Sequence, residues 1–215
     1  MLFAFGVMGW IDPFAIMNTI GLVAFAFVGA SKAIREEFDI FGITIVGLAM
    51  AFAGGVTRDI LVGRIPLALQ TVSEISLGLI GVALAIGIHL VRTSPETHPL
   101  TVVSDAIGLG AFATTGAIVA TEVALPAFGV IAIATINAVG GGAVADILLD
   151  RAPFILFEDF YASCAVLGGL AFVLVGYFII PVATAAGLCA AVTILVRLAA
   201  VRYHWELPTV PPQRS

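Results

Sequence analysis

The sequence at residues 53–61 reads AGGVTRDIL, and the sequence at residues 140–148 reads GGGAVADIL. The two stretches lie 87 positions apart, and the same offset aligns residues 20–66 with residues 107–153 without a gap. Nineteen of these 47 aligned positions are identical, and they include glycines, a carboxylate and a basic residue that an apolar composition alone would not align. A repeat of this length in a hydrophobic chain indicates two membrane half-bundles that face each other across a shared site.

The composition predicts an all-α integral membrane protein. Of the 215 residues, 61% are hydrophobic and 11% are charged, and the mean hydropathy is +1.17. A soluble domain carries roughly 25% charged residues, so this chain could not cover itself with a solvated surface. No basic patch points to nucleic acid, and no pattern of histidines or cysteines points to a metal site. We expect Cys164 and Cys189 to be small buried hydrophobes.

Seven segments are apolar and long enough to cross a bilayer, which takes about 20 residues. We expect a single transmembrane domain over residues 1–203, followed by a short tail at 204–215. Repeat 1 is expected at about 11–92, repeat 2 at about 100–180 and a seventh helix at about 182–203. The seven predicted spans are Ile11–Ser31, Phe38–Val62, Val72–Val91, Val103–Thr121, Val123–Leu149, Phe160–Ile180 and Val182–Val201.

The basic residues predict the orientation of these spans. If the first, third and fifth loops share one side with the C-terminus, that side holds seven basic residues and the other side holds only Arg64. The positive-inside rule then places the C-terminus in the cytoplasm and the N-terminus outside. Because each repeat has three helices, the two copies must run antiparallel, as a 3+3 inverted repeat. The seven residues are Lys32, Arg35, Arg92, Arg151, Arg197, Arg202 and Arg214.

The glycine motifs of the second and fifth spans have two readings. Each interior glycine weakens a helix by roughly 1 kcal/mol relative to alanine, which favours a kinked or broken helix beside a polar path. Small residues also allow helices to pack closely, and packing alone is the other reading. Because both copies place a carboxylate four residues after the last glycine, we favour the path. The candidate residues are Gly54, Gly55, Gly140, Gly141 and Gly142.

Asp59 and Asp146 are the most informative charges. A charged residue deep in a bilayer costs at least about 2–3 kcal/mol, so it usually faces a cavity or a partner. Both lie toward the ends of their spans, so interfacial capping groups are the alternative. Adjacent residues do not face each other on a helix, so we expect Arg58 to pair across helices, with Asp146 as the candidate. Ala145 replaces this arginine in the second copy.

Further polar groups lie along the first and fourth spans. Ser31 and Lys32 lie at the inner end of the first, and Thr114 and Thr115 lie partway along the fourth. These hydroxyls are candidates for the path, although they can also bond to carbonyls of their own helix. Glu74 and Asp105, near the starts of the third and fourth spans, are expected to be caps or interfacial groups.

These features resemble the trimeric intracellular cation channels, above all their prokaryotic members. The stretches that match are Gly21–Ala30, Gly54–Leu61 and Gly140–Leu148, and the resemblance covers about residues 12–203. It implies a homotrimer with one pore per protomer, lined by the first, second, fourth and fifth helices, with kinks at the glycine motifs. The permeant ion would be a monovalent cation, chiefly potassium, and no cofactor is implied. Animal members bind a phosphoinositide through basic residues of the fourth helix, and Ile107–Glu122 contains none, so that property is not carried over.

Two functions remain open from the sequence. A cation channel is the first, and a secondary transporter of a small solute such as an amino acid is the second, because inverted repeats with broken helices suit alternating access equally well. A membrane enzyme has little support, since the sequence offers no nucleophile–base pair and no metal cluster.

Overall fold

The computed structural model describes residues 12–91, 99–156, 160–176, 178, 181–205 and 207, and within them it contains seven α-helices and two short 3-10 helices. Six of the α-helices are long and apolar enough to cross a membrane. The α-helices are α1 Pro13–Arg35, α2 Ile40–Leu61, α3 Val72–Val91, α4 Pro99–Glu122, α5 Ala127–Leu148, α6 Ala162–Gly176 and α7 Val182–Tyr203. The 3-10 helices are η1 Leu67–Leu69, which follows α2, and η2 Phe154–Leu156, which follows α5.

The ends of the predicted spans lie within four residues of the helix ends, and the shortest α-helix among the described residues is α6. That helix has 15 residues, which corresponds to about 22 Å, less than the hydrocarbon thickness of about 30 Å. It begins two residues after the predicted start at Phe160 and ends at Gly176, and Ile179 and Ile180 lie outside the described residues. Residues 1–11 and most of the predicted tail at 204–215 also lie outside them.

Side chains and prolines define where several helices begin. Asp12 caps α1 by accepting a hydrogen bond from the backbone N–H of Phe14, with Pro13 as the first helical residue. Asp39 caps α2 in the same way through the N–H of Gly42. Pro126 and Pro181 directly precede α5 and α7. Proline suits such a position because it needs no hydrogen-bond donor there.

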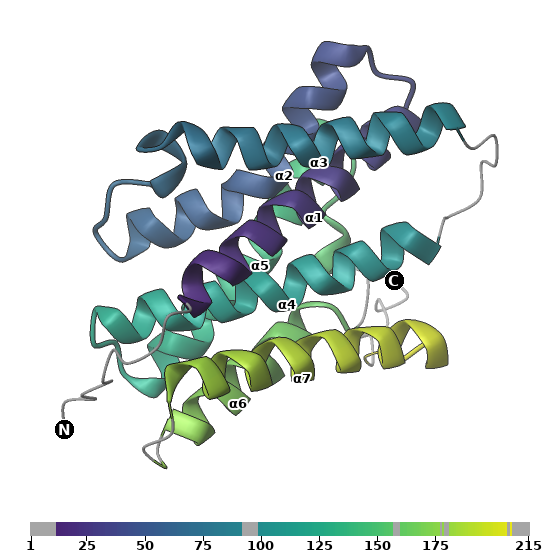
Figure 1. The fold of residues 1–215 in the computed structure, drawn as a ribbon. Helices are drawn as coiled ribbons and strands as arrows, with labels where there is room; N and C mark the ends of the chain where they lie inside the picture. Colours follow the sequence, from purple (N-terminus) through teal and green to yellow (C-terminus); the bar gives the residue numbers. More distant parts are fainter. Residues whose placement is uncertain are drawn as a thin grey trace, which may run out of the picture.

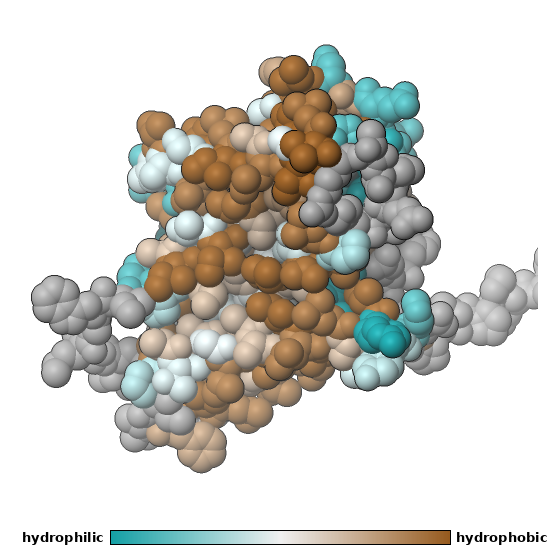
Figure 2. Space-filling model, turned by 45° about the vertical axis from the view of Figure 1, so that its right-hand side comes forward, coloured by the Kyte–Doolittle hydropathy of each residue, from teal (hydrophilic) through white to brown (hydrophobic). Residues whose placement is uncertain are grey.

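Helices α1 and α4 form the centre of the bundle. In Figure 1, α3 lies at one edge, α6 and α7 lie at the opposite edge, and α1 and α4 run between them. Helix α4 is the most buried of the six long helices. Apolar side chains cover the middle of the face in Figure 2, and hydrophilic ones lie toward its ends, as expected of a protein surrounded by lipid.

The two repeats meet at a pair of aromatic rings. Phe25 of α1 and Phe112 of α4 are equivalent positions, and their rings pack edge to face with centroids 5.1 Å apart. A Cβ on Gly21 would lie 2.4 Å from the Phe112 ring, and one on Gly108 would lie 2.2 Å from the Phe25 ring. Each ring therefore occupies the space that a glycine leaves in the other repeat, which is the contact expected at an internal two-fold axis.

Helices α2 and α5 cross at their glycines. A Cβ on Gly54 would lie 2.1 Å from the backbone oxygen of Asn137, and a Cβ on Gly141 would lie 1.9 Å from that of Met50. Both contacts are repeat equivalents, since 54 and 141, and 50 and 137, each differ by 87. Close packing through small residues is thus present at this crossing.

The glycines do not break the helices. Both α2 and α5 stay α-helical through their glycine motifs to Leu61 and Leu148, so the broken-helix form of the prediction is wrong. The physical reason is that the bare glycine faces are filled by the backbone of the opposite helix, which supports the α-helical conformation on both sides. Whether the two helices bend at these points stays a prediction.

The packing of the third helix differs between the two repeats. Helix α3 packs on α1, where a Cβ on Gly81 would lie 2.4 Å from the backbone oxygen of Val23. The equivalent Gly168 of α6 instead faces α7, where its Cβ would lie 1.9 Å from Thr193 Oγ1. Helix α7, which has no counterpart, packs on both α4 and α6.

Candidate functional site

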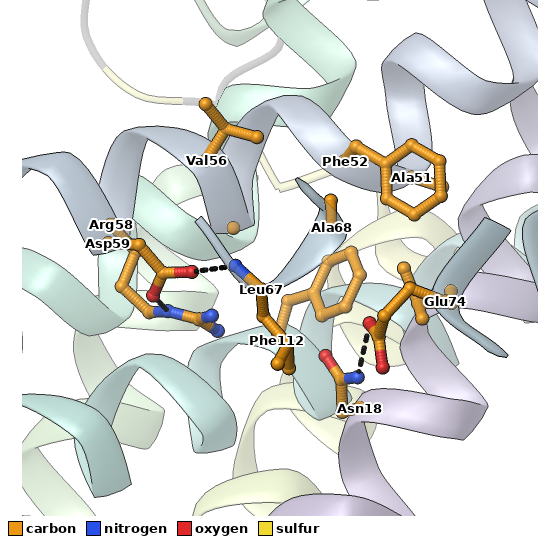
Figure 3. A pocket seen from close by; sticks show the side chains of 12 residues that line it. Asn18, Ala51, Phe52, Val56, Arg58, Asp59, Leu67, Ala68, Glu74 and Phe112 are labelled. Carbon is orange, nitrogen blue, oxygen red and sulfur yellow. Dashed lines mark hydrogen bonds and ion pairs between the residues drawn. The ribbon is translucent and has the colours of Figure 1, made fainter. Parts of the chain in front are cut away.

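A buried ion pair lies at the end of α2. The Nε atom of Arg58 is 2.8 Å from Oδ1 of Asp59, and both side chains are almost fully buried. Oδ2 of Asp59 accepts a hydrogen bond of 2.9 Å from the N–H of Leu67, so the carboxylate also holds the segment that follows the helix (Figure 3). The guanidinium lies over the ring of Phe14 of α1.

The expectation that Arg58 pairs with Asp146 across helices is therefore wrong. The rule that neighbours on a helix do not face each other describes the directions of their Cβ atoms, and it does not limit where the end of a long side chain can reach. Asp59 lies in the last turn, where its carboxylate turns toward the chain that leaves the helix, and the long arginine side chain can fold back to it. Asp146 already has a different cation.

That cation is Lys32 of α1. Its Nζ is 2.8 Å from Oδ1 of Asp146, and it lies 4.6 Å from the centroid of the Phe154 ring. Oδ2 of Asp146 accepts a hydrogen bond of 3.0 Å from the N–H of Phe154. Leu67 and Phe154 are 87 positions apart, so the two carboxylates hold equivalent segments, η1 and η2.

Both aspartates thus act partly as the capping groups that were the alternative reading. They are only 4% exposed, however, and each faces a cation inside the protein rather than the interface. Sequence reasoning selected Lys32 but not its partner. Ala145 could have predicted this pair. Because position 145 has no arginine, a buried Asp146 must pair with a cation from another part of the chain.

A second pair of equivalent hydrogen bonds was missed. Asn18 Nδ2 donates to Glu74 Oε2 at 2.9 Å, and Tyr161 donates through its hydroxyl to Asp105 Oδ1 at 3.0 Å. Positions 18 and 105, and positions 74 and 161, differ by 87. Asp105 is buried, with Arg197 Nε of α7 3.6 Å from its Oδ2, so the expectation of a cap or interfacial group is wrong for it. The constant offset of 87 could have predicted these pairs, because it relates both members of one hydrogen bond to both members of the other.

The predicted hydroxyls all donate to carbonyls of their own helix. Thr115 donates to the Phe112 oxygen at 3.2 Å and also accepts a hydrogen bond of 2.9 Å from Nδ2 of Asn137 on α5. Thr114 donates to the Gly110 oxygen and lies 3.4 Å from the Ala186 oxygen of α7. The structure therefore places Thr114 on the α7 side of α4, because successive residues of a helix point about 100° apart. Ser31 donates to the Phe27 oxygen one turn earlier, as the alternative reading expected.

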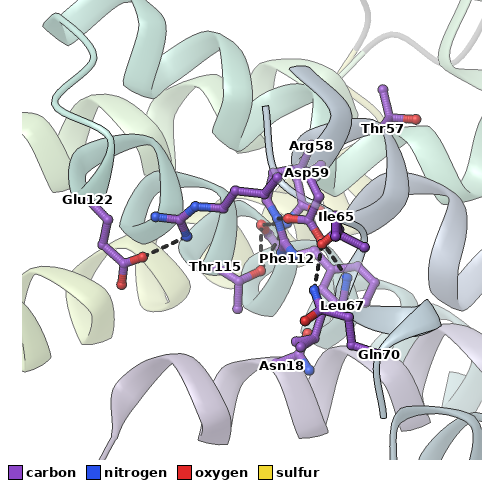
Figure 4. A network of polar contacts seen from close by, with 12 residues as sticks. Asn18, Thr57, Arg58, Asp59, Ile65, Leu67, Gln70, Phe112, Thr115 and Glu122 are labelled. Carbon is purple, nitrogen blue, oxygen red and sulfur yellow. Dashed lines mark hydrogen bonds and ion pairs between the residues drawn. The ribbon is translucent and has the colours of Figure 1, made fainter. Parts of the chain in front are cut away.

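Two exposed ion pairs continue the symmetry. Arg64, after α2, bonds to Glu122 at the end of α4, and Arg151, after α5, bonds to Glu36 at the end of α1. In Figure 4 a dashed line marks the ion pair of Glu122, and Arg58 and Asp59 lie in the same close-up. The two arginines are equivalent positions, so each end of the bundle ties one repeat to the other.

A small cavity opens beside the Arg58–Asp59 pair. The space that can hold the centre of a water molecule is about 20 Å³, which is room for roughly one water. Figure 3 shows Asn18, Glu74 and Arg58 around it, with the Phe112 ring at its base. It is lined by Asn18, Leu22, Ala51, Phe52, Gly55, Val56, Arg58, Asp59, Leu67, Ala68, Glu74 and Phe112. Among the described residues, no group of three or more His, Cys, Asp and Glu side chains could hold a metal ion.

The fold and the site define a class of membrane protein: an inverted repeat with one buried and one partly buried ion pair at the ends of two crossing helices. A family model described as "Glycine transporter" matches the chain twice, at residues 15–90 and 102–177. Both limits are again 87 apart, so each match covers one three-helix repeat.

Curated relatives match over most of the chain. The membrane protein YvgT of Bacillus subtilis is 34% identical over 196 residues, which is 90% of this chain and 94% of that protein. The inner membrane protein YadS of Escherichia coli is 32% identical over 197 residues, with the same coverage.

Solved structures match equally well. A TRIC cation channel superimposes with a TM-score of 0.84 at 32% identity, covering 94% of this chain and 98% of that one. The TRIC trimeric intracellular cation channel orthologue from Rhodobacter sphaeroides superimposes with a TM-score of 0.82 at 29% identity, covering 89% and 98%. The chain belongs to the TRIC family of trimeric intracellular cation channels.

Proposed function

We propose that this protein is a channel for monovalent cations, with a preference for potassium and one conducting path in each protomer. The path would run between α1, α2, α4 and α5. The observation that carries the proposal is the pair of equivalent carboxylates, Asp59 and Asp146, buried at opposite ends of the crossing between α2 and α5. The likeness to solved TRIC cation channels supports it.

The charges along this path favour cations. Arg58, Asp59 and Glu74 surround the cavity at one end, and Lys32 and Asp146 lie at the other. With all five side chains ionised, the sum is one negative charge. A path of this sign admits cations more readily than anions, while the two basic side chains raise local barriers that limit conductance.

The glycines of the two motifs differ in how closely the opposite helix packs against them. Gly54 and Gly141 are filled by the opposite backbone, whereas the Cβ position of Gly55 has only ordinary contacts, the nearest at 3.8 Å. We propose that bends at these motifs, including Gly140 and Gly142, widen the path during conduction. Replacing Gly55 and Gly142 together by leucine should then reduce potassium flux into liposomes strongly while the oligomer survives. Unchanged potassium flux would mean that the glycines serve only the packing of the helices.

We further propose a homotrimer in the plasma membrane of a prokaryote, with the N-terminus outside and the C-terminus in the cytoplasm. The relatives are membrane proteins, and the family is trimeric by name. On the outward side of this orientation lie Arg58 and Asp59, and on the cytoplasmic side lie Lys32 and Asp146. Reporters fused before Met1 and after Ser215, and a mass measurement in mild detergent, test these two points.

The deciding experiment is single-channel recording of the purified protein in planar bilayers. Discrete current steps, with a reversal potential in a potassium chloride gradient close to the potassium equilibrium potential, are the expected result. Smooth solute uptake without current steps would overturn the proposal.

A secondary transporter of a small solute is the second candidate. The family model's description as a glycine transporter favours it, and an inverted repeat with paired carboxylates suits alternating access. Counterflow of labelled glycine into proteoliposomes, abolished when either Asp59 or Asp146 is replaced by asparagine, is the result that would favour it over the channel.

A further inference from the structure

Asn137 holds its side-chain amide in a fixed orientation at the crossing of α2 and α5. Its Nδ2 atom donates to the backbone oxygen of Phe112 at 2.6 Å and to Thr115 Oγ1 at 2.9 Å. A backbone oxygen accepts only, so the group that faces it must be the NH₂ and the Oδ1 atom must point away. The side chain is fully buried.

The Oδ1 atom has no hydrogen-bond partner among the residues that the structure describes. Buried side-chain acceptors of this kind are nearly always satisfied, so an exception needs an explanation. Its surroundings supply one. Oδ1 lies 4.0 Å from the point where a Cβ on Gly55 would stand, and Arg58 Nη2 lies 3.8 Å from the same point. Gly55 and Arg58 both line the cavity of Figure 3.

The equivalent position in repeat 1 shows that the crossing does not require an amide. Met50 is the repeat mate of Asn137, and it too is fully buried. Its backbone oxygen packs against Gly141 as that of Asn137 packs against Gly54. A methionine thus serves the same backbone contact. The amide oxygen is an addition to the packing, and it lies beside Gly55, whose Cβ position has only ordinary contacts.

We propose that Oδ1 of Asn137 coordinates the permeating cation at the middle of the path and helps to select it. This inference rests on the proposed channel function. An amide carbonyl oxygen is the type of ligand that replaces a water molecule in the shell of a monovalent cation. The hydrogen bonds from Nδ2 to α4 already fix the orientation of the amide. No free energy is therefore needed to orient Oδ1 when a cation passes. The positive charge of Arg58 nearby makes such a ligand more important, since the oxygen would offset the repulsion between Arg58 and a passing cation.

The test compares four proteins by bi-ionic reversal potentials and single-channel conductance: wild type, Asn137→Leu, Asn137→Asp and Thr115→Val. Asn137→Leu should lower potassium conductance by about tenfold, the factor that corresponds to about 1.4 kcal/mol. Asn137→Asp keeps an oxygen but raises its field strength, and it should shift the preference from potassium toward sodium. Thr115→Val removes one hydrogen bond of the amide and leaves Oδ1 in place, so it is the control for a purely structural role.

The outcomes separate the two proposals. If wild type carries no cation current, the proposed function fails and this inference fails with it. If wild type conducts, but the Asn137 variants keep its potassium-to-sodium ratio and lose no more conductance than Thr115→Val, the inference alone is overturned. Should Asn137→Leu fail to form the native oligomer, the permeability ratio of Asn137→Asp decides the question.

Discussion

In repeat 1 the carboxylate at the end of α2 pairs with its own neighbour, Arg58, whereas in repeat 2 the equivalent Asp146 at the end of α5 pairs with Lys32 of α1. Both carboxylates hold the N–H group eight residues further along the chain. The first ion pair is therefore local to one helix, and the second ties two helices together. An inverted repeat can therefore keep its backbone symmetry while its two ends differ in which helices the ion pairs join.

Removing Lys32 should give the largest effect on this comparison. Lys32→Met leaves Asp146 buried without its cation, and breaking such a pair costs about 3–5 kcal/mol. The free energy of unfolding, measured in detergent, is the readout. Lys32→Met combined with Asp146→Asn is the matched control, because it removes the unpaired charge and should recover much of the loss. Equal destabilisation of the single and double variants would mean that the ion pair does not stabilise α1 against α5.

The glycine crossing offers the next largest effect. Gly54→Ala places a Cβ 2.1 Å from a backbone oxygen, and overpacking of this kind typically costs about 1–3 kcal/mol. Gly55→Ala, one residue away and with only ordinary contacts, is the control and should change stability little. Thermal unfolding of the two variants, with Gly141→Ala as the symmetric partner, checks the equivalence of the two repeats. Equal melting temperatures for Gly54→Ala and Gly55→Ala would contradict the close crossing.

Neutralising one carboxylate should change selectivity. A unit charge at 4 Å contributes about 1 kcal/mol even in water, so Asp146→Asn should lower the preference for cations over anions by about fivefold or more. Asp59→Asn at the other end should act in the same direction. The reversal potential in a potassium chloride gradient is the measurement. If neither variant changes it, the path is selected by backbone carbonyls and amide or hydroxyl oxygens alone.

The exposed ion pairs should matter least. Arg64 and Glu122 are well exposed, and surface pairs contribute about 0–1 kcal/mol. Arg64→Gln, and Arg151→Gln as its repeat mate, should each lower stability by less than about 1 kcal/mol, with a loss that shrinks as salt is added. A loss of several kcal/mol that persists in 1 M salt would assign these pairs a larger role in joining the repeats.

The repeat made much of this fold predictable. A constant offset of 87, together with apolar segments of spanning length, predicted the helices and their antiparallel arrangement. The same offset relates the Phe25–Phe112 contact, the crossing at Gly54 and Gly141, and the bonds at Leu67 and Phe154. Such contacts depend on backbone position, which a repeat preserves.

The partners of the charged side chains were less predictable. Lys32 and Asp146 are 114 positions apart, and nothing local in the sequence joins them. The rule of helix neighbours excluded the Arg58–Asp59 pair because it does not account for a flexible side chain at a helix end. The open oxygen of Asn137 required the positions of α4 and α5 together. Side-chain pairing follows from three-dimensional placement, and in this protein the two repeats use different residues for it.

The hydrogen bonds Asn18–Glu74 and Asp105–Tyr161 carry a consequence for how the two halves could have diverged. In repeat 1 the carboxylate lies on α3, and in repeat 2 it lies on α4, the counterpart of α1. Exchanging one residue alone, as in Asn18→Asp, would set two carboxylates against each other, and Asp105→Asn alone would leave Arg197 beside a neutral amide. The order of the changes therefore matters. Glu74→Tyr first leaves a neutral pair in which Asn18 can accept from the tyrosine hydroxyl, and Asn18→Asp can follow, whereas the reverse order passes through two facing carboxylates.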